Sequence, residues 1–300
     1  MNPKFSIVIP NLHSPIIDQV LHAIRQQRYP LAEVEVIVVG LDKYNLVKDD
    51  DLVSFISTEQ PTPPAKATNI GLQHARGEII CLLDADCLVE PDWLEALDHH
   101  FSDPEVYVVA GTFDFPTDDF WTIADSLAHY SEVLGRQKMR LPEAPSQNFA
   151  LRRVVIEQVG ALDDRFPRPG GEDTEFTRRL SDAGFDIWFA PNVKVFHQVK
   201  RPSLALFCER SFRFGRYSVW GLPDEAWKQK RPLYLSHWAL ALLTSPIMPP
   251  YFAFLTFWQN PHLLRFWYTF PALVLSRFVW RLGVAKSLWR PEIEEIAHFF

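Results

Sequence analysis

Five short apolar runs, separated by segments with helical spacing, constrain the fold of this chain more than any other feature. They are rich in valine and isoleucine and cover residues 5–10, 34–40, 52–58, 78–84 and 106–112. Continuous hydrophobic strands are typical of a parallel sheet covered on both faces, and helices between the strands supply the crossover connections. We therefore predict an α/β fold in which a mostly parallel sheet carries helices on both faces.

Two acidic residues, Asp84 and Asp86, lie at the end of the fourth run. On an extended chain their carboxylates point the same way, and like charges this close require a cation or a proton between them. In open α/β sheets, ligands bind beyond the carboxyl ends of strands, which is where this pair is expected. The alternative is that the pair caps a helix that begins at Pro91, a favoured first helical position. A second aspartate run, residues 49–51, follows no apolar strand and is interpreted as a solvated loop.

The composition argues against several classes of protein. Of the 300 residues, 47% are hydrophobic, enough for a full core in one large or two smaller domains. A net charge of −7 argues against nucleic acid as a partner, because a nucleic-acid binder shows a basic face. The three cysteines have neither zinc spacing nor a disulfide framework, so a reduced, intracellular compartment is expected. Because a strand is predicted from residue 5, no signal peptide is expected.

A long segment without charge divides the chain near residue 231. Between Arg231 and Arg265 there is no Asp, Glu, Lys or Arg. We therefore predict a first domain over residues 1–231 and an apolar, aromatic-rich helical region over residues 232–300. The uncharged segment is longer than the roughly 20 residues that a membrane span needs, but prolines interrupt it.

Two interpretations of this helical region stay open. Basic residues and tryptophans flank its apolar arms, as at membrane interfaces, which favours a helical hairpin that dips into the cytoplasmic leaflet. Upstream, Arg210, Arg213 and Arg216 alternate with aromatic residues and are expected to extend this surface. The alternative is a soluble subdomain that buries its apolar faces on the first domain or on a second subunit. The candidate interface aromatics are Trp238, Trp258, Trp267, Tyr268 and Trp280.

Several short segments follow one another along residues 5–216: SIVIP, QQRYP before VEVIVV, ATNIGLQHARGEIICLLDADC, SQNFALRR, VGALDDRF, GGEDTEFTRRLSDAGF and PNVKVFH. Each segment alone is weak evidence. In this order and spacing, they resemble the family 2 glycosyltransferases. The family has the GT-A fold, a Rossmann-like sheet that binds nucleotide sugars, and the resemblance implies that fold and that activity.

The resemblance also implies a donor site. Asp84 would approach the ribose of a nucleoside diphosphate sugar, and Asp86 would bind a divalent cation, Mg²⁺ or Mn²⁺, on the diphosphate. Diphosphate is a poor leaving group until its charge is neutralised, and a hard cation with carboxylate ligands does this. His197 matches a histidine that can complete the metal shell, although a lone histidine after a strand is also common as a structural residue. The other residues assigned to the donor site are Pro10 and Asp42, at the nucleobase, and Asn69.

Glu172 and Asp173 match the acid pair at the mouth of the family's acceptor site. The resemblance makes Asp173 the general base that deprotonates the acceptor hydroxyl, and it leaves Glu172 to orient the acceptor or the loop. Without the resemblance, acids in a first helical turn would be explained by the helix dipole. The preceding Gly170 and Gly171 favour the catalytic role, because a flexible loop suits a site that admits a substrate.

Two departures from the family pattern limit what it implies. The acid after the second strand arrives late, in Gly40-Leu41-Asp42, so the identity of the nucleobase stays open. The Gln-x-x-Arg-Trp signature of processive synthases is missing, which predicts transfer of a single sugar per encounter.

We therefore expect a metal-dependent, inverting, non-processive glycosyltransferase that is cytoplasmic and associated with the inner face of the cell membrane. Its acceptor would be a lipid-linked saccharide, a lipid or a polysaccharide precursor. The first alternative is a nucleotidyltransferase, but that chemistry would need a glycine-rich, basic loop after the first strand, and PNLHSP has neither. The second is a non-catalytic partner protein with the same fold, and the presence of both acid pairs counts against it.

Overall fold

The computed structural model describes residues 2–135, 137–198, 200–201, 203–220 and 232–290. Contacts within the chain divide it into two compact units, and each unit is described by itself. The first unit contains Met1–Asp114, Glu132–Pro169 and Phe176–Gln198. The second contains Phe115–Ser131, Gly170–Glu175 and Val199–Phe300.

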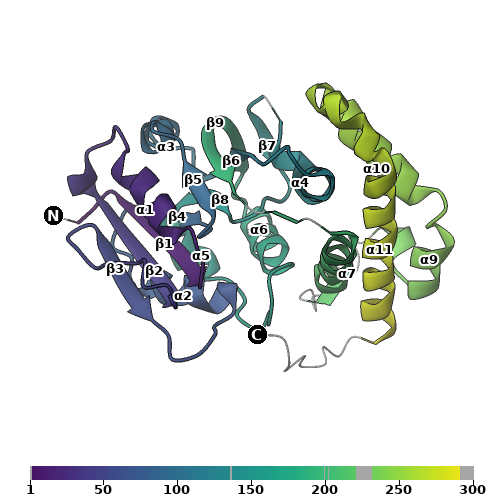
Figure 1. Cartoon of the computed structure of the whole chain (residues 1–300), viewed down its shortest axis with the longest axis horizontal. Coiled ribbons are helices and arrows are strands. Elements are labelled where there is room, and N and C mark those ends of the chain that lie inside the picture. Colours follow the sequence, from purple (N-terminus) through teal and green to yellow (C-terminus); the bar gives the residue numbers. More distant parts are fainter. Residues whose placement is uncertain (1, 136, 199, 202, 221–231, 291–300) are drawn as a thin grey trace. The chain divides into compact units, whose positions relative to one another are not determined.

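The first unit is built on a nine-stranded sheet (Figure 1). Strands β3, β2, β1 and β4 are parallel neighbours in this order. The five predicted runs are all strands, and the predicted α/β fold with a mostly parallel sheet and flanking helices is confirmed. These strands are β1 (Phe5–Leu12), β2 (Val34–Leu41), β3 (Val53–Ser57), β4 (Ile79–Leu83) and β6 (Val108–Asp114).

The other half of the sheet mixes directions. β8 (Asn148–Arg152) is antiparallel to both β4 and β6, and β9 (Ile187–His197) is parallel to β6. β5 (Cys87–Val89) and β7 (Met139–Leu141) are both antiparallel to β9. β4 and β5 therefore follow each other in the chain but pair with different strands, and residues 84–86, which include Asp84 and Asp86, form the turn between them.

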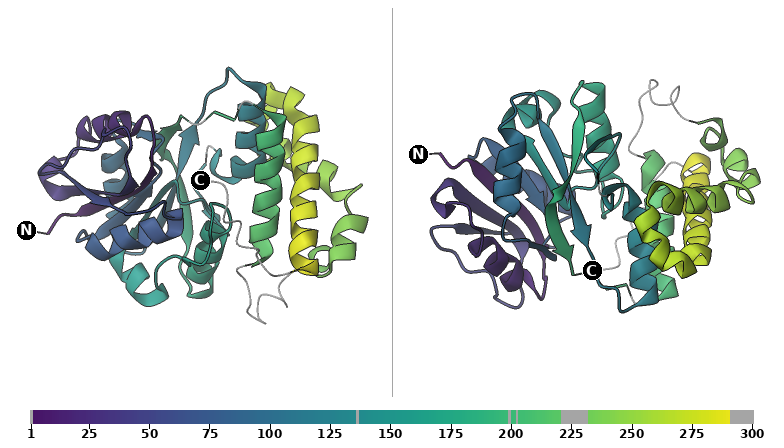
Figure 2. Two further views of the ribbon diagram at one scale, coloured as in Figure 1. Left: turned by 60° about the horizontal axis from the view of Figure 1, so that its bottom comes forward. Right: turned by 90° about the horizontal axis from the view of Figure 1, so that it is seen from above.

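Helices lie on both sides of this sheet (Figure 2). α2 (Pro64–His74) packs on β1 and β2, and α3 (Trp93–Phe101) packs against β9. The fully buried Trp93, at the first position of α3, donates from its indole nitrogen to the Asn148 side chain at 2.9 Å and so ties this helix to β8. The remaining helices of the unit are α1 (Ile17–Arg25), α5 (Arg153–Val159) and, from Phe176 onward, α6 (Glu172–Asp182).

The second unit is helical. Its longest helices, α7 (Leu204–Trp220) and α11 (Phe270–Trp289), lie side by side (Figure 1). Gly215 of α7 lets the backbones meet, because a Cβ atom there would lie 2.6 Å from the carbonyl carbon of Trp280. The other helices among the described residues of this unit are α4 (Phe120–Tyr130), α9 (Trp238–Leu243) and α10 (Met248–Gln259), with 3₁₀ segments η3 (Leu233–Leu235) and η4 (Pro261–Thr269).

The compact units do not coincide with the predicted ranges 1–231 and 232–300. Residue 231 lies outside the described residues. Helices α4 and α7, which precede it, belong to the helical unit because both pack against α11. The extent of the catalytic domain is a functional assignment and stays a prediction.

No helix in the described part of the chain combines the length and the apolarity that a membrane crossing requires. Part of the apolar surface of the C-terminal region is buried within its own unit, where Ala241, Val284 and Ala285 form a small core with Val219 of α7.

Candidate active site

Asp84 and Asp86 lie at the carboxyl end of β4, where the sequence places them. The Asp84 amide donates to the carbonyl of Gln147 at 3.3 Å, and the Asp84 carbonyl accepts from the Cys87 amide at 3.1 Å, which closes a tight turn. The Ser14 hydroxyl donates to the Ala85 carbonyl at 2.7 Å and fixes this turn from the loop after β1. The capping alternative is wrong, because β5 separates the pair from α3, which begins at Trp93 with Asp92 as its N-cap residue.

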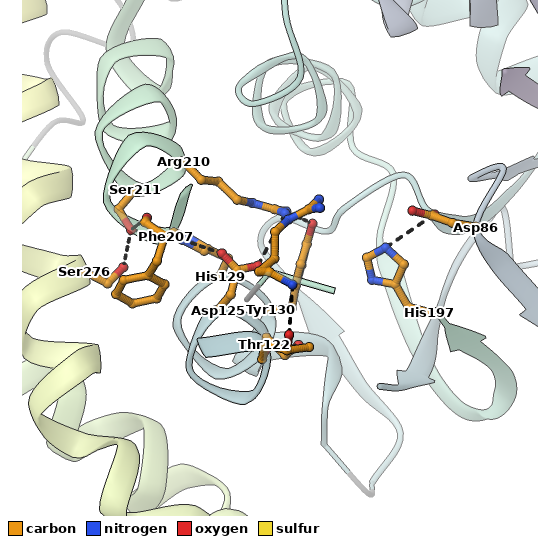
Figure 3. Close-up of polar contacts among 12 residues, drawn as sticks. Asp86, Thr122, Asp125, His129, Tyr130, His197, Phe207, Arg210, Ser211 and Ser276 are labelled. Atoms are coloured by element: carbon orange, nitrogen blue, oxygen red, sulfur yellow. Dashed lines mark hydrogen bonds and ion pairs between the residues drawn. The ribbon is translucent and has the colours of Figure 1, made fainter. Parts of the chain in front are cut away.

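Asp86 lies beside His197, the last residue of β9 (Figure 3). Nε2 of His197 is 3.4 Å from Oδ1 of Asp86, and the Asp86 carbonyl accepts from the Gln198 amide at 2.8 Å. The edge of the Phe113 ring meets the imidazole at a centroid distance of 5.6 Å and restricts its rotation. The His197 side chain is 5% exposed and the Asp86 side chain 31% exposed, so solvent reaches the pair mainly at the carboxylate.

Three side chains here could hold a metal ion. One ligand atom each from Asp86, Cys87 and His197 lies within 4.8 Å of the others. Burial raises the pKa of the Cys87 thiol well above its ordinary value, and the charges of Asp86 and Asp84 add to the effect, so the neutral thiol is favoured in the metal-free protein. The carboxylate and the imidazole are then the two donors that suit a hard divalent cation, so the residues fit the Mg²⁺ or Mn²⁺ predicted for this position.

The two residues predicted at the nucleobase lie at the same edge of the sheet. Pro10 is in β1, and Asp42 follows β2, the parallel neighbour of β1. Oδ2 of Asp42 accepts from the Val47 amide at 2.7 Å. Oδ1 is buried and has no hydrogen-bond partner among the described residues. A buried acceptor without a donor is costly, so this oxygen suits a ligand N–H group.

Asn69 of α2 has a clear structural contact. Its side-chain nitrogen donates to the Leu162 carbonyl at 2.8 Å, and its oxygen accepts from the Leu162 amide at 3.1 Å. This pair of bonds fastens the loop after α5 to α2. Contact between Asn69 and a donor stays a prediction.

The predicted acceptor residues, Glu172 and Asp173, begin α6 and belong to the helical unit. Glu172 is buried, and its carboxylate accepts from the Gly170 amide at 2.6 Å. This bond closes the loop, and it supports the loop-orienting role that was one of the two expected for Glu172. Asp173 is the next residue along the helix and is half-buried.

The loop before this acid pair rests on an aromatic ring of α7. Gly170 has a φ of +121°, and a Cβ atom on it would lie 2.6 Å from Cε1 of Phe214. The guanidinium carbon of Arg210 lies 4.8 Å from the centroid of the Phe214 ring, and the His129 ring meets its edge at 4.8 Å. The Phe214 ring therefore packs against the loop at Gly170 and is itself held by Arg210 and His129.

The two neighbours of Phe214 belong to a buried polar cluster (Figure 3). It is formed by Asp125, His129, Arg210, Ser211 and Ser276. Nη1 of Arg210 is 3.4 Å from Oδ2 of Asp125, and Nη2 donates to the Tyr130 hydroxyl. The Ser211 hydroxyl lies 3.2 Å from Nε2 of His129 and 2.8 Å from the hydroxyl of Ser276. The cluster joins α4, α7 and α11.

This cluster corrects one expectation from the sequence. Arg210, Arg213 and Arg216 were expected on a basic surface, but Arg210 is 7% exposed and Arg216 is 9% exposed. Arg210 turns inward to Asp125, and Arg213 pairs with Glu209 at 3.2 Å. The signal that indicates the cluster is the pair of Asp125 and His129, one helical turn apart in a helix with no other Asp, Glu, His, Lys or Arg.

Comparisons with known proteins show the family of the chain. The family model "Glycosyltransferase like family 2" matches residues 3–216. The chain is 29% identical to the glycosyltransferase AglE of Haloferax volcanii over 233 residues, 73% of this chain and 75% of that one. It is 23% identical to the glucosyl-dolichyl phosphate glucuronosyltransferase of the same organism, over 52% of this chain and 54% of the relative.

A solved structure extends the likeness to nearly the whole chain. The mannosyltransferase PcManGT of Pyrobaculum calidifontis, in complex with GDP-Man and Mn²⁺, superposes with a TM-score of 0.60 at 21% sequence identity. The match covers 97% of this chain and 89% of that one, so the likeness of fold includes the helical unit.

Proposed function

The chain belongs to glycosyltransferase family 2, and we propose that it transfers one sugar from a nucleoside diphosphate sugar to a hydroxyl group, with help from a divalent cation. The observation that carries the proposal is the pair of Asp86 and His197, which approach to 3.4 Å at the edge of the sheet where ligands bind in α/β folds. These residues are distant in the sequence and come together only through the pairing of β5 with β9.

The donor would be held at three points along that edge. The buried Oδ1 of Asp42 would accept an N–H group of the nucleobase, beside Pro10. Asp84 would accept a ribose hydroxyl. Asp86 and His197 would hold Mg²⁺ or Mn²⁺, which when bound neutralises charge on the leaving diphosphate. The Mn²⁺ bound with GDP-Man in the Pyrobaculum enzyme supports this choice of ion.

Asp173 would act as the general base. Its carboxylate takes the proton of the acceptor hydroxyl while the acceptor oxygen attacks the anomeric carbon. The bond from that carbon to the diphosphate breaks in the same step, and the nucleoside diphosphate leaves with the bonding electrons. A single displacement of this kind inverts the anomeric configuration. Glu172 would hold the loop closed through its bond to Gly170.

Exposed aromatic residues of the helical unit support the proposal that the acceptor is associated with a membrane. Tyr251, Phe254 and Trp258 of α10 lie at helical spacing and are 52%, 53% and 71% exposed. Water disfavours such a stripe, whereas the headgroup boundary of a bilayer accommodates it. We propose that the protein works at the cytoplasmic face of a membrane on a lipid-linked saccharide, a lipid or a polysaccharide precursor. The Haloferax relative named for glucosyl-dolichyl phosphate makes the lipid-linked class the first to test.

Thermal unfolding with a panel of nucleotide sugars tests the proposal. A donor present at 100 times its Kd adds about 2.7 kcal/mol to the free energy of unfolding. One nucleotide sugar should raise the melting temperature in the presence of Mn²⁺ and lose that effect in EDTA. Transfer to an acceptor must then be shown with the same donor. Binding without transfer would favour a non-catalytic nucleotide-sugar-binding protein, and synthesis of a nucleotide sugar from a sugar phosphate would favour a nucleotidyltransferase.

A further inference from the structure

The helical unit contains an apolar groove between the end of α10 and the start of α11. Its volume is about 560 Å³, within the range of sites that bind small ligands. The groove is distinct from the predicted donor and acceptor residues, and none of its lining residues is polar. It is lined by Phe254, Phe257, Trp258, Pro261, Leu264, Trp267 and Phe270.

The walls of this groove are unusually open to solvent for their size. Trp258 is 71% exposed, Trp267 69% and Leu264 53%. The Phe254 and Trp258 rings stack at a centroid distance of 5.8 Å and form one wall. A contiguous apolar surface of this kind marks an interaction site in soluble proteins.

The charge around the groove indicates what fills it. From Pro232 to Arg290 the sequence contains five Lys and Arg residues and no Asp or Glu. One of the five, Arg265, is exposed and lies between the lining residues Leu264 and Trp267, with its guanidinium carbon 4.6 Å from the centroid of the Phe266 ring. The groove thus combines an apolar channel with a cation at its rim.

We propose that this aromatic groove binds one acyl chain of an anionic phospholipid, with the lipid phosphate at Arg265. A hydrocarbon tail matches the apolar walls, and the phosphate matches the basic rim. A second copy of the chain fits less well, because a symmetric contact over this groove would bring two Arg265 side chains of like charge together. The inference rests on the membrane part of the proposed function and adds a specific lipid site to it.

Fluorescence quenching by brominated lipids tests the site on the full chain. Vesicles of phosphatidylglycerol with bromine atoms on the acyl chains should quench tryptophan emission, and vesicles of brominated phosphatidylcholine should do so only at higher lipid concentration. Exchanging both Trp258 and Trp267 for Phe should remove most of the quenching and leave vesicle binding in place.

Three further variants separate the groove from general membrane affinity. Leu264→Glu should weaken binding to phosphatidylglycerol vesicles by at least about tenfold, the equivalent of two buried methylene groups. Arg265→Ala should weaken it by about fivefold. Leu206→Glu is the matched control, since Leu206 is a comparably exposed leucine on α7, at 47%, and should bind as the native protein does.

Several results would overturn the inference. Equal binding by the Leu264 and Leu206 variants would show that no specific groove is used. A dimer in solution that Leu264→Glu dissolves would assign the groove to a second copy, and binding of polyprenyl phosphate without phosphatidylglycerol would assign it to another lipid. Sugar transfer by a protein that binds no vesicles would contradict the lipid site and leave the glycosyltransferase proposal intact. Lipid binding without sugar transfer would contradict the glycosyltransferase proposal and leave the lipid site intact.

Discussion

The ring of Phe214 closes the space beneath Gly170, so that a Cβ atom on Gly170 would lie 2.6 Å from Cε1 of the ring. Gly170 also donates its amide to Glu172, the residue before the proposed base Asp173. The path of the loop is therefore set by α7, a helix of the same unit.

Gly170→Ala should lower the rate of transfer by about 10²-fold, because a displacement of the base by 1 Å is enough for a loss of that size. Donor affinity should not change, since the residues assigned to the donor belong to the first unit. The rate of transfer and donor binding by calorimetry check both points. Gly184→Ala is the control, because Gly184 also has a positive φ, of +88°, but its Cβ would meet nothing within 4 Å. Equal losses in the two variants would show that backbone strain, not the Phe214 contact, matters.

Asp86→Asn should abolish the Mn²⁺-dependent part of nucleotide-sugar binding while the fold is kept. His197→Gln should weaken metal affinity by at least about tenfold, because the imidazole supplies a second donor atom. Titration of Mn²⁺ in the presence of the nucleotide sugar measures both effects. Asp51→Asn, in an exposed loop, serves as the control. If the native protein binds the nucleotide equally well with and without EDTA, the metal assignment is wrong.

Asp173→Asn should retain donor affinity and lose about 10²- to 10⁴-fold in transfer rate, the usual effect of removing a general base. Single-turnover transfer from a radiolabelled donor measures the rate, and equilibrium binding measures the affinity. Glu175→Gln changes a second acid in the same helical turn and should keep most of the activity. A transfer rate within about threefold of the native one in Asp173→Asn would make Asp173 a helix-end charge and place the base elsewhere.

The sheet and the acidic turn could be predicted from the sequence because both depend on residues that are close together in the chain. The strands are continuous β-branched runs, and Asp84 and Asp86 follow one of them directly. The place of β5 was not readable, because a strand of three residues has no pattern of its own and is fixed by its partner β9. The approach of Asp86 to His197 depends on that pairing, so only the resemblance to a family indicated it.

The support of the acceptor loop was missed for a different physical reason. Alternating basic and aromatic residues look the same whether the arginines face solvent or an internal acid. Arg210 is buried because Asp125, which lies 85 residues earlier in the chain on α4, offers a charge inside the unit. That pairing is non-local and depends on how α4 and α7 pack, which the spacing of residues along either helix does not encode.

The last prediction concerns the stability of the helical unit in acid. Burial lowers the pKa of His129 to about 3; the charge of Asp125 opposes this shift, while those of Arg210, Arg277 and Arg213 add to it. An unfolded histidine has a pKa of about 6.5, so between these values the unfolded chain binds a proton that the folded chain does not. Stability should therefore fall as the pH drops below about 6.5.

The size of this effect follows from the width of the pH interval. Between pH 6.5 and about 3, each pH unit lowers the free energy of unfolding by about 1.4 kcal/mol, so at pH 5 this residue alone should lower it by about 2 kcal/mol. Urea unfolding between pH 7.5 and 5, followed through the helical signal, measures the slope. His129→Gln keeps a polar partner for Ser211, does not titrate and should flatten that slope. His22→Gln, at an exposed position of α1, should leave it as in the native protein. If the slope is the same with and without the His129 imidazole, the acid sensitivity of the fold comes from other groups.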